Sequence, residues 1–386
     1  MATIEDFKKY VADVQSRAGY TKPTAFGLGI RKSKGDKTLE VFYPMINFET
    51  AYGTAALLQD VTGYDKNSNG FVKVKKTKLQ EAFDKFEAFH SEIEKHPNIS
   101  IIHHLLRQFK KVKGYAKVDI IAYFLFDKDT AVETPEEGYF KTQCLSQLLV
   151  KPHQIGVAGI FGKMINVAWT NKGPILPEDL AAQRIKATFK GEVLTVSHVD
   201  KFPYMVNFHV PNGVRIVSGD RVRLGAYLSS GTTVMPAGFI NFNAGTLGNA
   251  MVEGRISAGV VVDKNSDIGG GASIMGTLSG GNKNVISIGQ KCLLGANAGT
   301  GISLGNGCTV AAGVYVTAGS KVSLYNDKKE PVDINGNVVA EGANIVKWME
   351  LNGKDNLLFI NNSQTGKLTC RPNQSLIELN ASLHTD

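Results

Sequence analysis

Across residues 212–322 the chain repeats a pattern of six residues. In each repeat an aliphatic or small side chain is followed by a small residue, usually glycine, as in Leu224-Gly225, Ile268-Gly269 and Leu304-Gly305. Such a hexad forms one flat side of a triangular parallel β-helix with about 18 residues per coil, because its inward side chains stack on the coils above and below. The pattern therefore predicts a solenoid across this region.

The six-residue register breaks at three places in the repeat, near residues 243–249, 279–287 and 300–303. An insertion can leave a solenoid only through a corner, and loops are where binding groups collect. We therefore expect these three segments to form the walls of a binding site.

The residues before the repeat show helix and strand patterns of a mixed α/β domain. Thr3 with Asp6 predicts a capped first helix, whose apolar face carries Ile4, Phe7, Val11 and Val14. A second apolar stripe predicts one further helix with Leu79, Phe83, Phe86, Phe89 and Ile93. We expect strands near 38–43 and 118–126 and a short helix over 177–184.

These patterns divide the chain into three parts. We predict an N-terminal α/β domain over residues 1–205, a left-handed parallel β-helix over 206–325 and a short C-terminal β extension over 326–386. The segment 326–342 is expected to be a surface hairpin. At 386 residues and 43% hydrophobic content, the chain is long enough for two or three separate cores.

Composition places the chain among cytoplasmic proteins. No export leader is visible, and no apolar run reaches the roughly 18 residues that a membrane span needs. The four cysteines lie far apart without metal-binding spacing, and Cys292 and Cys308 occupy inward hexad positions. We interpret these two cysteines as small core residues.

The net charge of +8 indicates anionic partners without selecting one. Basic residues cluster at 73–78 and 107–113, outside the repeat. Nucleic acid is one interpretation of these clusters, but no aromatic residues interleave with them, so solvated helix flanks are favoured. We therefore expect neither a nucleic-acid nor a membrane partner.

The repeat contains few groups that can do chemistry. None of the eight histidines lies between Val210 and Leu383, which excludes an imidazole base within the coils and a three-histidine zinc site. Residues 212–322 hold four acids, and Glu253 is the sole glutamate among them. Glu253 lies two residues before Arg255, and on an extended segment the two side chains should share a face. They are either a base beside an anion-binding group or an ordinary surface ion pair.

Glycine-rich stretches at 269–271 and 276–281 favour the functional interpretation, although tight corners of the solenoid also need glycine. Backbone N–H groups in such stretches can bind a developing oxyanion. Lys283 and Lys291 lie near the following loop, where phosphate groups of a ligand are expected.

Four longer segments carry a specific resemblance, which covers the solenoid. They are 241–248 (NFNAGTLG), 251–259 (MVEGRISAG), 268–281 (IGGGASIMGTLSGG) and 285–299 (VISIGQKCLLGANAG). Together with Val346-Lys347, 356–359 (NLLF) and Asn362-Ser363, they resemble tetrahydrodipicolinate N-succinyltransferases of the longer bacterial type.

The resemblance implies an enzyme of lysine and diaminopimelate biosynthesis that moves a succinyl group from succinyl-CoA to an amine. It also implies a homotrimer of left-handed β-helices with active sites between subunits. Glu253 matches the catalytic glutamate, and Gly276 matches the backbone donor to the oxyanion. The positions that match contacts to CoA are Arg255, Gly270, Ser273, Ala296, Ala311, Ala312, Gly319, Lys347, Ile360, Asn361, Asn362 and Ser363.

The role of the glutamate stays open between two chemistries. An amine must lose a proton before it attacks, and a carboxylate in a dry cleft can accept that proton. The carboxylate can instead attack the thioester itself and form an acyl-anhydride, which requires exclusion of water. The first role is favoured here.

Two further expectations concern metal and acceptor. Some relatives pair an acid with the equivalent of Asp220 to bind magnesium on the trimer axis, whereas this chain has Ala237 at that position. Asp220 alone predicts a weak cation site without strong magnesium dependence. Arg215, Arg221 and Arg223 are candidates for binding the carboxylates of the acceptor. The alternative functions are acetyl transfer to another amine, such as an amino sugar, and a non-catalytic trimeric scaffold.

Overall fold

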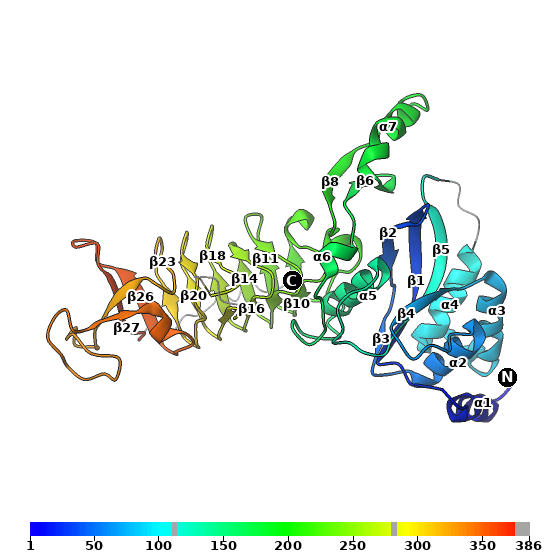
Figure 1. Cartoon of the computed structure of the whole chain (residues 1–386), viewed down its shortest axis with the longest axis horizontal. Coiled ribbons are helices and arrows are strands. Elements are labelled where there is room, and N and C mark those ends of the chain that lie inside the picture. The colour runs from blue at the N-terminus through cyan, green and yellow to red at the C-terminus, as the bar shows by residue number, and fades with distance from the viewer. Residues whose placement is uncertain (110–113, 279–283, 375–386) are drawn as a thin grey trace. The chain divides into compact units, whose positions relative to one another are not determined.

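The computed structural model describes residues 1–109, 114–278 and 284–374. The chain forms two compact units (Figure 1). The α/β unit contains residues 1–144 and 154–203, and the coil unit contains 145–153 together with the residues from 204 onward. The predicted boundary at 205 and the separate extension after 325 stay predictions.

The α/β unit is built on an antiparallel sheet with strand order β2-β1-β5-β4, and β3 pairs with the start of β1. The strands are β1 (Ala25–Lys34), β2 (Lys37–Phe42), β3 (Asn47–Phe48), β4 (Gly70–Lys73) and β5 (Lys117–Leu125). Strands β1 and β5 pair along nine residues, from Ala25 opposite Leu125 to Ser33 opposite Lys117. The strands predicted near 38–43 and 118–126 are thereby confirmed.

Helices cover both faces of this sheet (Figure 1). They are α1 (Ile4–Ser16), α2 (Tyr52–Thr62), α3 (Lys76–Lys85), α4 (Pro97–Gln108) and α5 (Pro135–Ser146). Helices α2, α3 and α4 share one core with β1 and β5, in which Leu57, Leu79 and Phe124 are fully buried. Helix α5 packs through Phe140, whose ring lies 5.0 Å from that of Tyr43 and 4.7 Å from that of Tyr123.

Charged side chains are buried beside α5. Arg31 Nε lies 2.7 Å from Glu136 Oε1, and both residues also bond the hydroxyl of Thr38. Lys141 Nζ lies 2.9 Å from Glu137 Oε1 with side-chain exposures of 0% and 3%. The first pair ties α5 to β1 of the sheet, and the second lies within α5, where Lys141 Nζ also donates to Thr130 O at 2.6 Å. Loss of one partner would leave a buried charge.

One of the two predicted N-terminal helices is confirmed as predicted, and the other is not a single helix. The first helix is confirmed, because Thr3 Oγ1 accepts from the N–H of Asp6 at 3.1 Å as an N-cap. The second apolar stripe is wrong as a single helix: α3 ends at Lys85, and a 3₁₀ segment follows over Glu87–Lys95 with a non-helical residue at Glu92. The phenylalanines of this stripe are therefore divided between α3 and the 3₁₀ segment, and a kink interrupts the helical path.

A smaller antiparallel sheet, β7-β6-β8, completes the α/β unit. It contains β6 (Val167–Thr170), β7 (Gly173–Ile175) and β8 (Val196–Asp200), and α6 (Ile160–Lys163) precedes it. The helix predicted over 177–184 exists as a 3₁₀ turn, η2 (Pro177–Asp179), continued by α7 (Leu180–Thr188).

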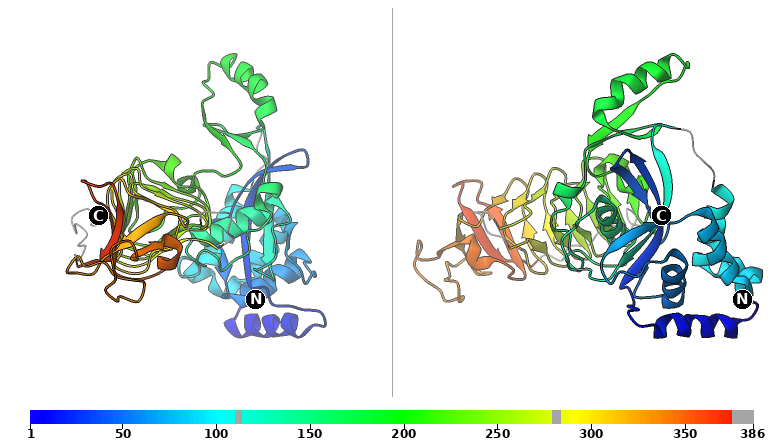
Figure 2. Two further views of the ribbon diagram at one scale, coloured as in Figure 1. Left: turned by 60° about the vertical axis from the view of Figure 1, so that its left-hand side comes forward. Right: turned by 45° about the vertical axis from the view of Figure 1, so that its right-hand side comes forward.

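The coil unit consists of three parallel sheets, which are the three faces of a β-helix. The first face contains β9 (Arg215–Ile216), β11 (Thr232–Val234), β14 (Ala250–Val252), β17 (Ser266–Ile268), β20 (Leu293–Leu294) and β22 (Thr309–Val310). The second contains β12 (Phe239–Ile240), β15 (Arg255–Ile256), β18 (Ser273–Ile274), β21 (Gly299–Thr300) and β23 (Tyr315–Val316). The third contains β10 (Tyr227–Leu228), β13 (Gly245–Thr246), β16 (Val261–Val262) and β19 (Ser287–Ile288). Figure 2 shows the turns stacked upon one another.

The side chains that the hexad pattern predicts to point inward are buried. Val234, Val252, Ile268 and Leu294 stack on successive rungs of the first face, each with 0% exposure. Burial of these aliphatic columns stabilises the coil by roughly 25 cal/mol for each Å² of apolar surface removed from water.

All four cysteines of the chain are free and buried. Cys292 and Cys308 lie inside the coil, as predicted. Burial raises the pKa of the Cys144 and Cys370 thiols, which keeps both protonated.

Two of the three segments predicted to be inserted loops are not insertions, while their place in the wall of a binding site stays a prediction. Residues 243–249 contain the regular strand β13, which pairs with β10 and β16. Residues 300–303 form a shortened corner, after which Leu304 bridges Ile288. The hexad spacing is intact at 243–249; the register is lost because two residues are missing between Val252 and Ile256, at the corner that follows β14, and two more between Thr300 and Leu304. The 279–287 segment does leave the coil: Thr277 and Val285 form its antiparallel base, while 279–283 lie outside the described residues.

The C-terminal strands extend the first face. They are β24 (Lys321–Leu324), β25 (Ile345–Lys347), β26 (Leu357–Asn361) and β27 (Leu368–Pro372). Strand β26 pairs in parallel with β22 and antiparallel with β27. The segment 326–342 contains two tight turns, closed by the bridges Tyr325–Pro331 and Val332–Val338, so the predicted hairpin is confirmed. Among the residues described, no helix is long and apolar enough to cross a bilayer.

Candidate active site

Glu253 lies at the corner between the first and second faces, directly after β14. Its N–H donates to the carbonyl of Ile268 at 2.8 Å, and its carbonyl accepts from the N–H of Gly271 at 3.3 Å. The side chain is half-buried and points toward the next coil, where a Cβ built on Gly270 would lie 3.6 Å from Glu253 Oε2. The backbone is therefore fixed by the coil, while the carboxylate stays accessible.

Small residues continue this corner through the following coils. We call it the Glu253 corner; it contains 253–254, 269–271, 295–297 and 311–313. Its backbone forms a ladder, in which Asn297 N–H donates to Gly270 O and Gly313 N–H donates to Ala296 O, each at 2.9 Å. Ala296 and Ala312 are exposed. The absence of larger side chains leaves a smooth wall along which an extended ligand can lie.

Gly254 turns the chain at this corner. A Cβ at this position would lie 2.5 Å from the carbonyl oxygen of Ala272 and 2.9 Å from that of Gly269, so only glycine fits without displacement. Arg255 then starts β15 on the second face, where it pairs with Ser273 of β18. The prediction that Glu253 and Arg255 share one face is therefore wrong, because a corner separates them.

Arg255 and Ser273 form a polar pair on the second face. Arg255 Nη2 donates to Ser273 Oγ at 2.6 Å, and the arginine is exposed. The guanidinium is oriented by this bond and retains donors for an anionic ligand. Two of the residues that match CoA contacts are thus in direct contact.

Gly276 lies at the opposite end of the second face, at the corner that leads to the third face. This Gly276 corner contains 241–243, 257–259, 275–277, 301–303 and 317–319. The Gly276 carbonyl accepts from Ile286 N–H at 3.3 Å, and a Cβ here would lie 3.2 Å from Ala258 O. Among the hydrogen bonds of the described residues, none uses the N–H of Gly276, which remains available to a ligand oxygen.

Within one chain, the two residues that match catalytic positions do not lie together. Glu253 and Gly276 lie at opposite corners of the second face. They also lie on successive coil turns, because Glu253 precedes β15, Gly276 follows β18, and these two strands pair. Gly319, exposed, lies two coil turns further along the Gly276 corner. The two residues are therefore at different places on the surface of one coil.

A histidine that the sequence analysis missed lies at the Gly276 corner. His153 belongs to the segment 145–153, and its Nε2 lies 2.6 Å from Gly259 O. The N–H of His153 donates to Asn243 Oδ1 at 3.2 Å, and its φ is +69°. The hexad pattern gave no signal for it, because it is brought to the coil from a segment that precedes the repeat.

The remaining positions that match CoA contacts divide between the two corners. Strand β26 carries Ile360 and Asn361 past the Glu253 corner, since Ala311 N–H donates to Phe359 O at 2.9 Å. Asn362 and Ser363 begin the β26–β27 turn, in which Asn362 Oδ1 accepts from Gln364 N–H at 2.9 Å. Lys347 is exposed on β25, opposite Lys321, next to the residues that follow Gly319.

Tyr315 is a second feature that the sequence analysis missed. It is 43% exposed on the second face, and its ring lies so close to Gly299 that a Cβ there would approach it to 2.2 Å. The glycine at 299 makes room for the ring. A flat aromatic surface is therefore exposed on the face between the two corners.

Asp220 does not form a built cation site. Its carboxylate accepts from Ser218 Oγ and lies 3.5 Å from Arg221 Nε. Within the part of the chain that the structure describes, no group of three or more His, Cys, Asp or Glu side chains is arranged to hold a metal ion. The weak cation site predicted on a trimer axis needs the Asp220 carboxylate of several copies, so it stays a prediction.

Two of the three arginines that were predicted to bind the acceptor carboxylates already interact with other residues of this chain. Arg221 pairs with Asp220, and Arg223 Nη1 donates to Asn241 Oδ1 at 3.3 Å. Arg215 is exposed beside the thioether of Met235. Lys291 is exposed at the third corner with φ of +54°, and Lys283 lies outside the described residues.

Family models match most of the chain. Residues 5–162 match the tetrahydrodipicolinate N-succinyltransferase N-terminal model and 165–204 match the corresponding middle model. Residues 285–318 match the hexapeptide repeat of succinyl-transferase.

Whole proteins and a solved structure agree with these models. A 2,3,4,5-tetrahydropyridine-2,6-dicarboxylate N-succinyltransferase of Vibrio cholerae is 45% identical over 93% of this chain and 98% of its own length. One of Pseudomonas putida is 42% identical over 93% and 97%. A Campylobacter jejuni crystal structure, provisionally named a 2,3,4,5-tetrahydropyridine-2-carboxylate N-succinyltransferase, aligns with a TM-score of 0.87 and 35% identity over 97% of this chain and 99% of that one.

Proposed function

The chain belongs to the tetrahydrodipicolinate N-succinyltransferase family, and we propose that it moves a succinyl group from succinyl-CoA to the amino group of ring-opened tetrahydrodipicolinate. This reaction is a step of lysine and diaminopimelate biosynthesis. The observation that carries the proposal is the 45% identity with the Vibrio cholerae enzyme, which extends over 98% of that protein. The likeness therefore includes both units and not the repeat alone.

We assign the proton transfer to Glu253. An alkyl amine, whose pKa in water is about 10, is protonated near neutral pH and must lose a proton before its nitrogen can attack. The Glu253 carboxylate is half-buried but accessible at its corner, where it can accept that proton. The nitrogen then bonds to the thioester carbonyl carbon and the C–S bond breaks. The second N–H proton goes to the departing CoA thiolate, and Glu253 returns the first proton to water, which leaves the amide, the CoA thiol and the free carboxylate.

Gly276 is the proposed donor to the oxyanion. During attack the carbonyl oxygen of the thioester becomes negative, and a backbone N–H at a fixed position stabilises that charge without reorganisation. The carbonyl of Gly276 is held by Ile286 N–H, which fixes the orientation of the peptide group nearby. A peptide N–H held at a corner of the coil is therefore already in place before the charge develops.

The separation of Glu253 from Gly276 supports a homotrimer with active sites between subunits. Each copy offers a Glu253 corner and a Gly276 corner, so neighbouring copies can supply one half-site each. We also propose that the coil is left-handed, as in the family that the chain resembles. The single carboxylate of Asp220 gives no reason to route any step through magnesium.

The succinyl-CoA molecule is proposed to lie along the coil axis. The small residues of the Glu253 corner (Gly270, Ala296, Ala311 and Ala312) leave room for the extended pantetheine arm. Arg255, oriented by Ser273, and exposed Lys347 supply positive charge for phosphates. Exposed residues 360–363 and Gly319 complete the proposed contacts.

We propose the cytoplasm as the site of action. Four free, buried thiols are typical of a protein from a reducing compartment.

A thiol-release assay tests the proposed function. The purified chain is mixed with succinyl-CoA or acetyl-CoA, each with and without tetrahydrodipicolinate, and free CoA thiol is measured. The expected result is fast release only with succinyl-CoA and the acceptor together. Release with acetyl-CoA and an amino sugar would contradict the proposal, as would the absence of any CoA binding, which is the property of a scaffold.

A further inference from the structure

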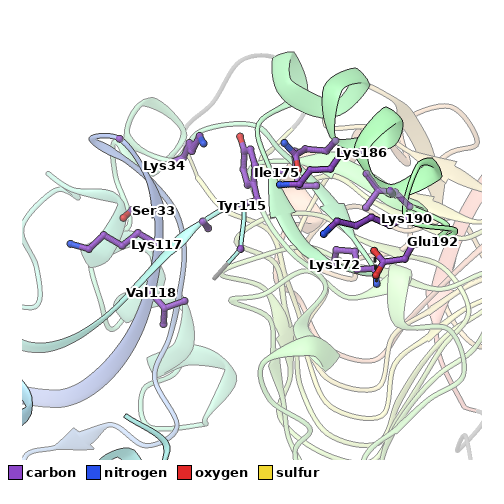
Figure 3. A pocket seen from close by; sticks show the side chains of 16 residues that line it. Ser33, Lys34, Tyr115, Lys117, Val118, Lys172, Ile175, Lys186, Lys190 and Glu192 are labelled. Atoms are coloured by element: carbon purple, nitrogen blue, oxygen red, sulfur yellow. Dashed lines mark ion pairs between the residues drawn. The ribbon is translucent and has the colours of Figure 1, made fainter. Parts of the chain in front are cut away.

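A cavity of about 980 Å³ lies within the α/β unit and is lined only by residues that acyl transfer does not use. The turn between β1 and β2 and the start of β5 form one wall (Figure 3). Helix α7, the residues that follow it and the β6–β7 turn form the other wall. This volume is at the upper end of the range for small-molecule sites.

Positive charge dominates the lining of the cavity. Its charged residues are Lys34, Lys117, Lys172, Lys186, Lys190 and Glu192. Two of the lysines are neutralised, because Lys117 lies 3.0 Å from Asp119 and Lys172 lies 3.5 Å from Glu192.

Three lysines of the cavity keep their charge uncompensated. Within residues 1–109, 114–278 and 284–374, no ion pair includes Lys34, Lys186 or Lys190. Lys34 belongs to the strand wall, where its ammonium group lies 4.7 Å from the centre of the Tyr115 ring. Lys186, on α7, and Lys190, just after the end of α7, extend toward the wall that carries Tyr115 (Figure 3).

The two walls are tied together at one end of the cavity. Tyr115 Oη donates to Asp179 at 2.6 Å and accepts from Leu176 N–H at 3.2 Å. Burial, together with this bond to Asp179, raises the pKa of Tyr115 to about 12, so the hydroxyl stays a donor. Lys37 Nζ and Glu178 Oε1, 2.9 Å apart, join the β1–β2 turn to the same segment. The spacing of the walls is therefore set by bonds on both sides of Tyr115.

The lining of the cavity also contains apolar side chains from both walls, which we call its floor. Ile175 is 2% exposed and Ala187 is 7% exposed, and Val118 and Leu194 lie beside them half-buried. Solvated lysines on an ordinary surface diverge into water. Here three like charges face one cavity with an apolar floor, an arrangement that an anion of matching length stabilises.

We propose that this cavity binds a small molecule that carries a di- or triphosphate chain. Charge on two facing walls, Lys34 on one and Lys186 with Lys190 on the other, suits an elongated anion better than a compact one. Lysine is a common partner of phosphate groups, and the floor beside Tyr115 accepts a flat apolar group such as a nucleobase. A free phosphate chain and a nucleotide share this chemistry, and the test separates them.

Calorimetric titration tests the proposal, with saturating CoA present so that nucleotides cannot report on the donor site. The probes are inorganic triphosphate, ATP and citrate. The test variant is K34Q/K186Q/K190Q, and the control is K8Q/K66Q/K328Q, which removes the same charge from exposed positions elsewhere. The expected result is binding of triphosphate or ATP that weakens at least about tenfold in the test variant and less than about twofold in the control.

Several results would overturn the proposal. They are the absence of binding by both triphosphate and ATP, equal weakening in the two variants, and citrate binding as tight as that of triphosphate. Tighter binding of ATP than of triphosphate identifies a nucleotide, and the reverse identifies a free phosphate chain. The rate of succinyl transfer is measured on the same samples. It is expected to be unchanged in the test variant, so the two proposals fail independently.

Discussion

In the α/β unit four charged side chains, Arg31, Glu136, Glu137 and Lys141, are buried within the core, whereas the buried side chains of the coil are aliphatic, small or uncharged. The charged residues of the coil that the structure describes lie at corners or on outer faces, accessible to solvent. Charge therefore stabilises packing in one unit and is available for chemistry in the other. This difference leads to opposite expectations for substitutions in the two units.

Replacement of Glu253 by glutamine has the largest expected effect on turnover. The amide keeps the size of the side chain but cannot accept the proton, so kcat/KM should fall by about 10²–10⁴-fold. The melting temperature should stay that of the parent, because the side chain packs against no core. Steady-state kinetics and thermal unfolding check both. Asp263→Asn, at the third corner, is the matched control and should keep full activity; equal losses in both variants would contradict the assignment.

Replacement of Lys141 by methionine has the largest expected effect on stability. Glu137 would then be buried without its partner 2.9 Å away, at a cost of about 3–5 kcal/mol in the free energy of unfolding. Urea unfolding measures this cost. Lys163→Met removes a lysine whose carboxylate partner, Glu133, is 71% exposed, and this should cost less than about 1 kcal/mol. Equal costs would show that burial does not distinguish the pairs.

Replacement of Leu294 by alanine tests the apolar core of the coil. The side chain is 0% exposed between rungs, so its loss should leave a cavity that costs about 2–5 kcal/mol. Its neighbour Leu293 points outward and is half-buried, and Leu293→Ala should cost clearly less. Chemical denaturation of both variants tests whether inward and outward side chains alternate along the strand as described. If the outward leucine mattered more, the assignment of inward positions would be incorrect.

The smallest expected effect is that of His153→Phe. This change removes the bond to Gly259 O, worth about 0.5–1.5 kcal/mol, and loosens the Gly276 corner. The expected loss in kcat/KM is about 2–10-fold, with most of it in kcat and little change in the melting temperature. His153→Gln retains a donor and should recover part of the rate. A full loss of activity in both variants would instead place the imidazole in direct contact with the substrates.

The sequence predicted those features that local patterns determine. The inward columns of the coil follow from hexads, and the Thr3 cap follows from Thr3 and Asp6, three positions apart. Glu253 was identified because residues 212–322 contain no other glutamate. These features need no knowledge of distant contacts.

Other features depend on contacts between distant segments and gave no local signal. The corner at Gly254 separates Glu253 from Arg255, although both lie in one extended stretch of sequence. His153 reaches the coil through a bond to Gly259, 106 residues further along the chain. The end of α3 at Lys85 and the kink at Glu92 interrupt an apolar stripe that is continuous in the sequence. The basic cavity takes its three unpaired lysines from β1, from α7 and from the residues just after α7, which no sequence spacing connects.

The most direct test of the central claim, that Glu253 accepts a proton and is not itself acylated, is a rapid-quench measurement without acceptor. Enzyme and succinyl-CoA are mixed, free thiol is counted per active site, and the peptide that contains residues 251–255 is examined by mass spectrometry. The account predicts no burst of thiol and an unmodified Glu253 until tetrahydrodipicolinate is added. A burst of one thiol per site with a succinyl group on Glu253 would contradict it.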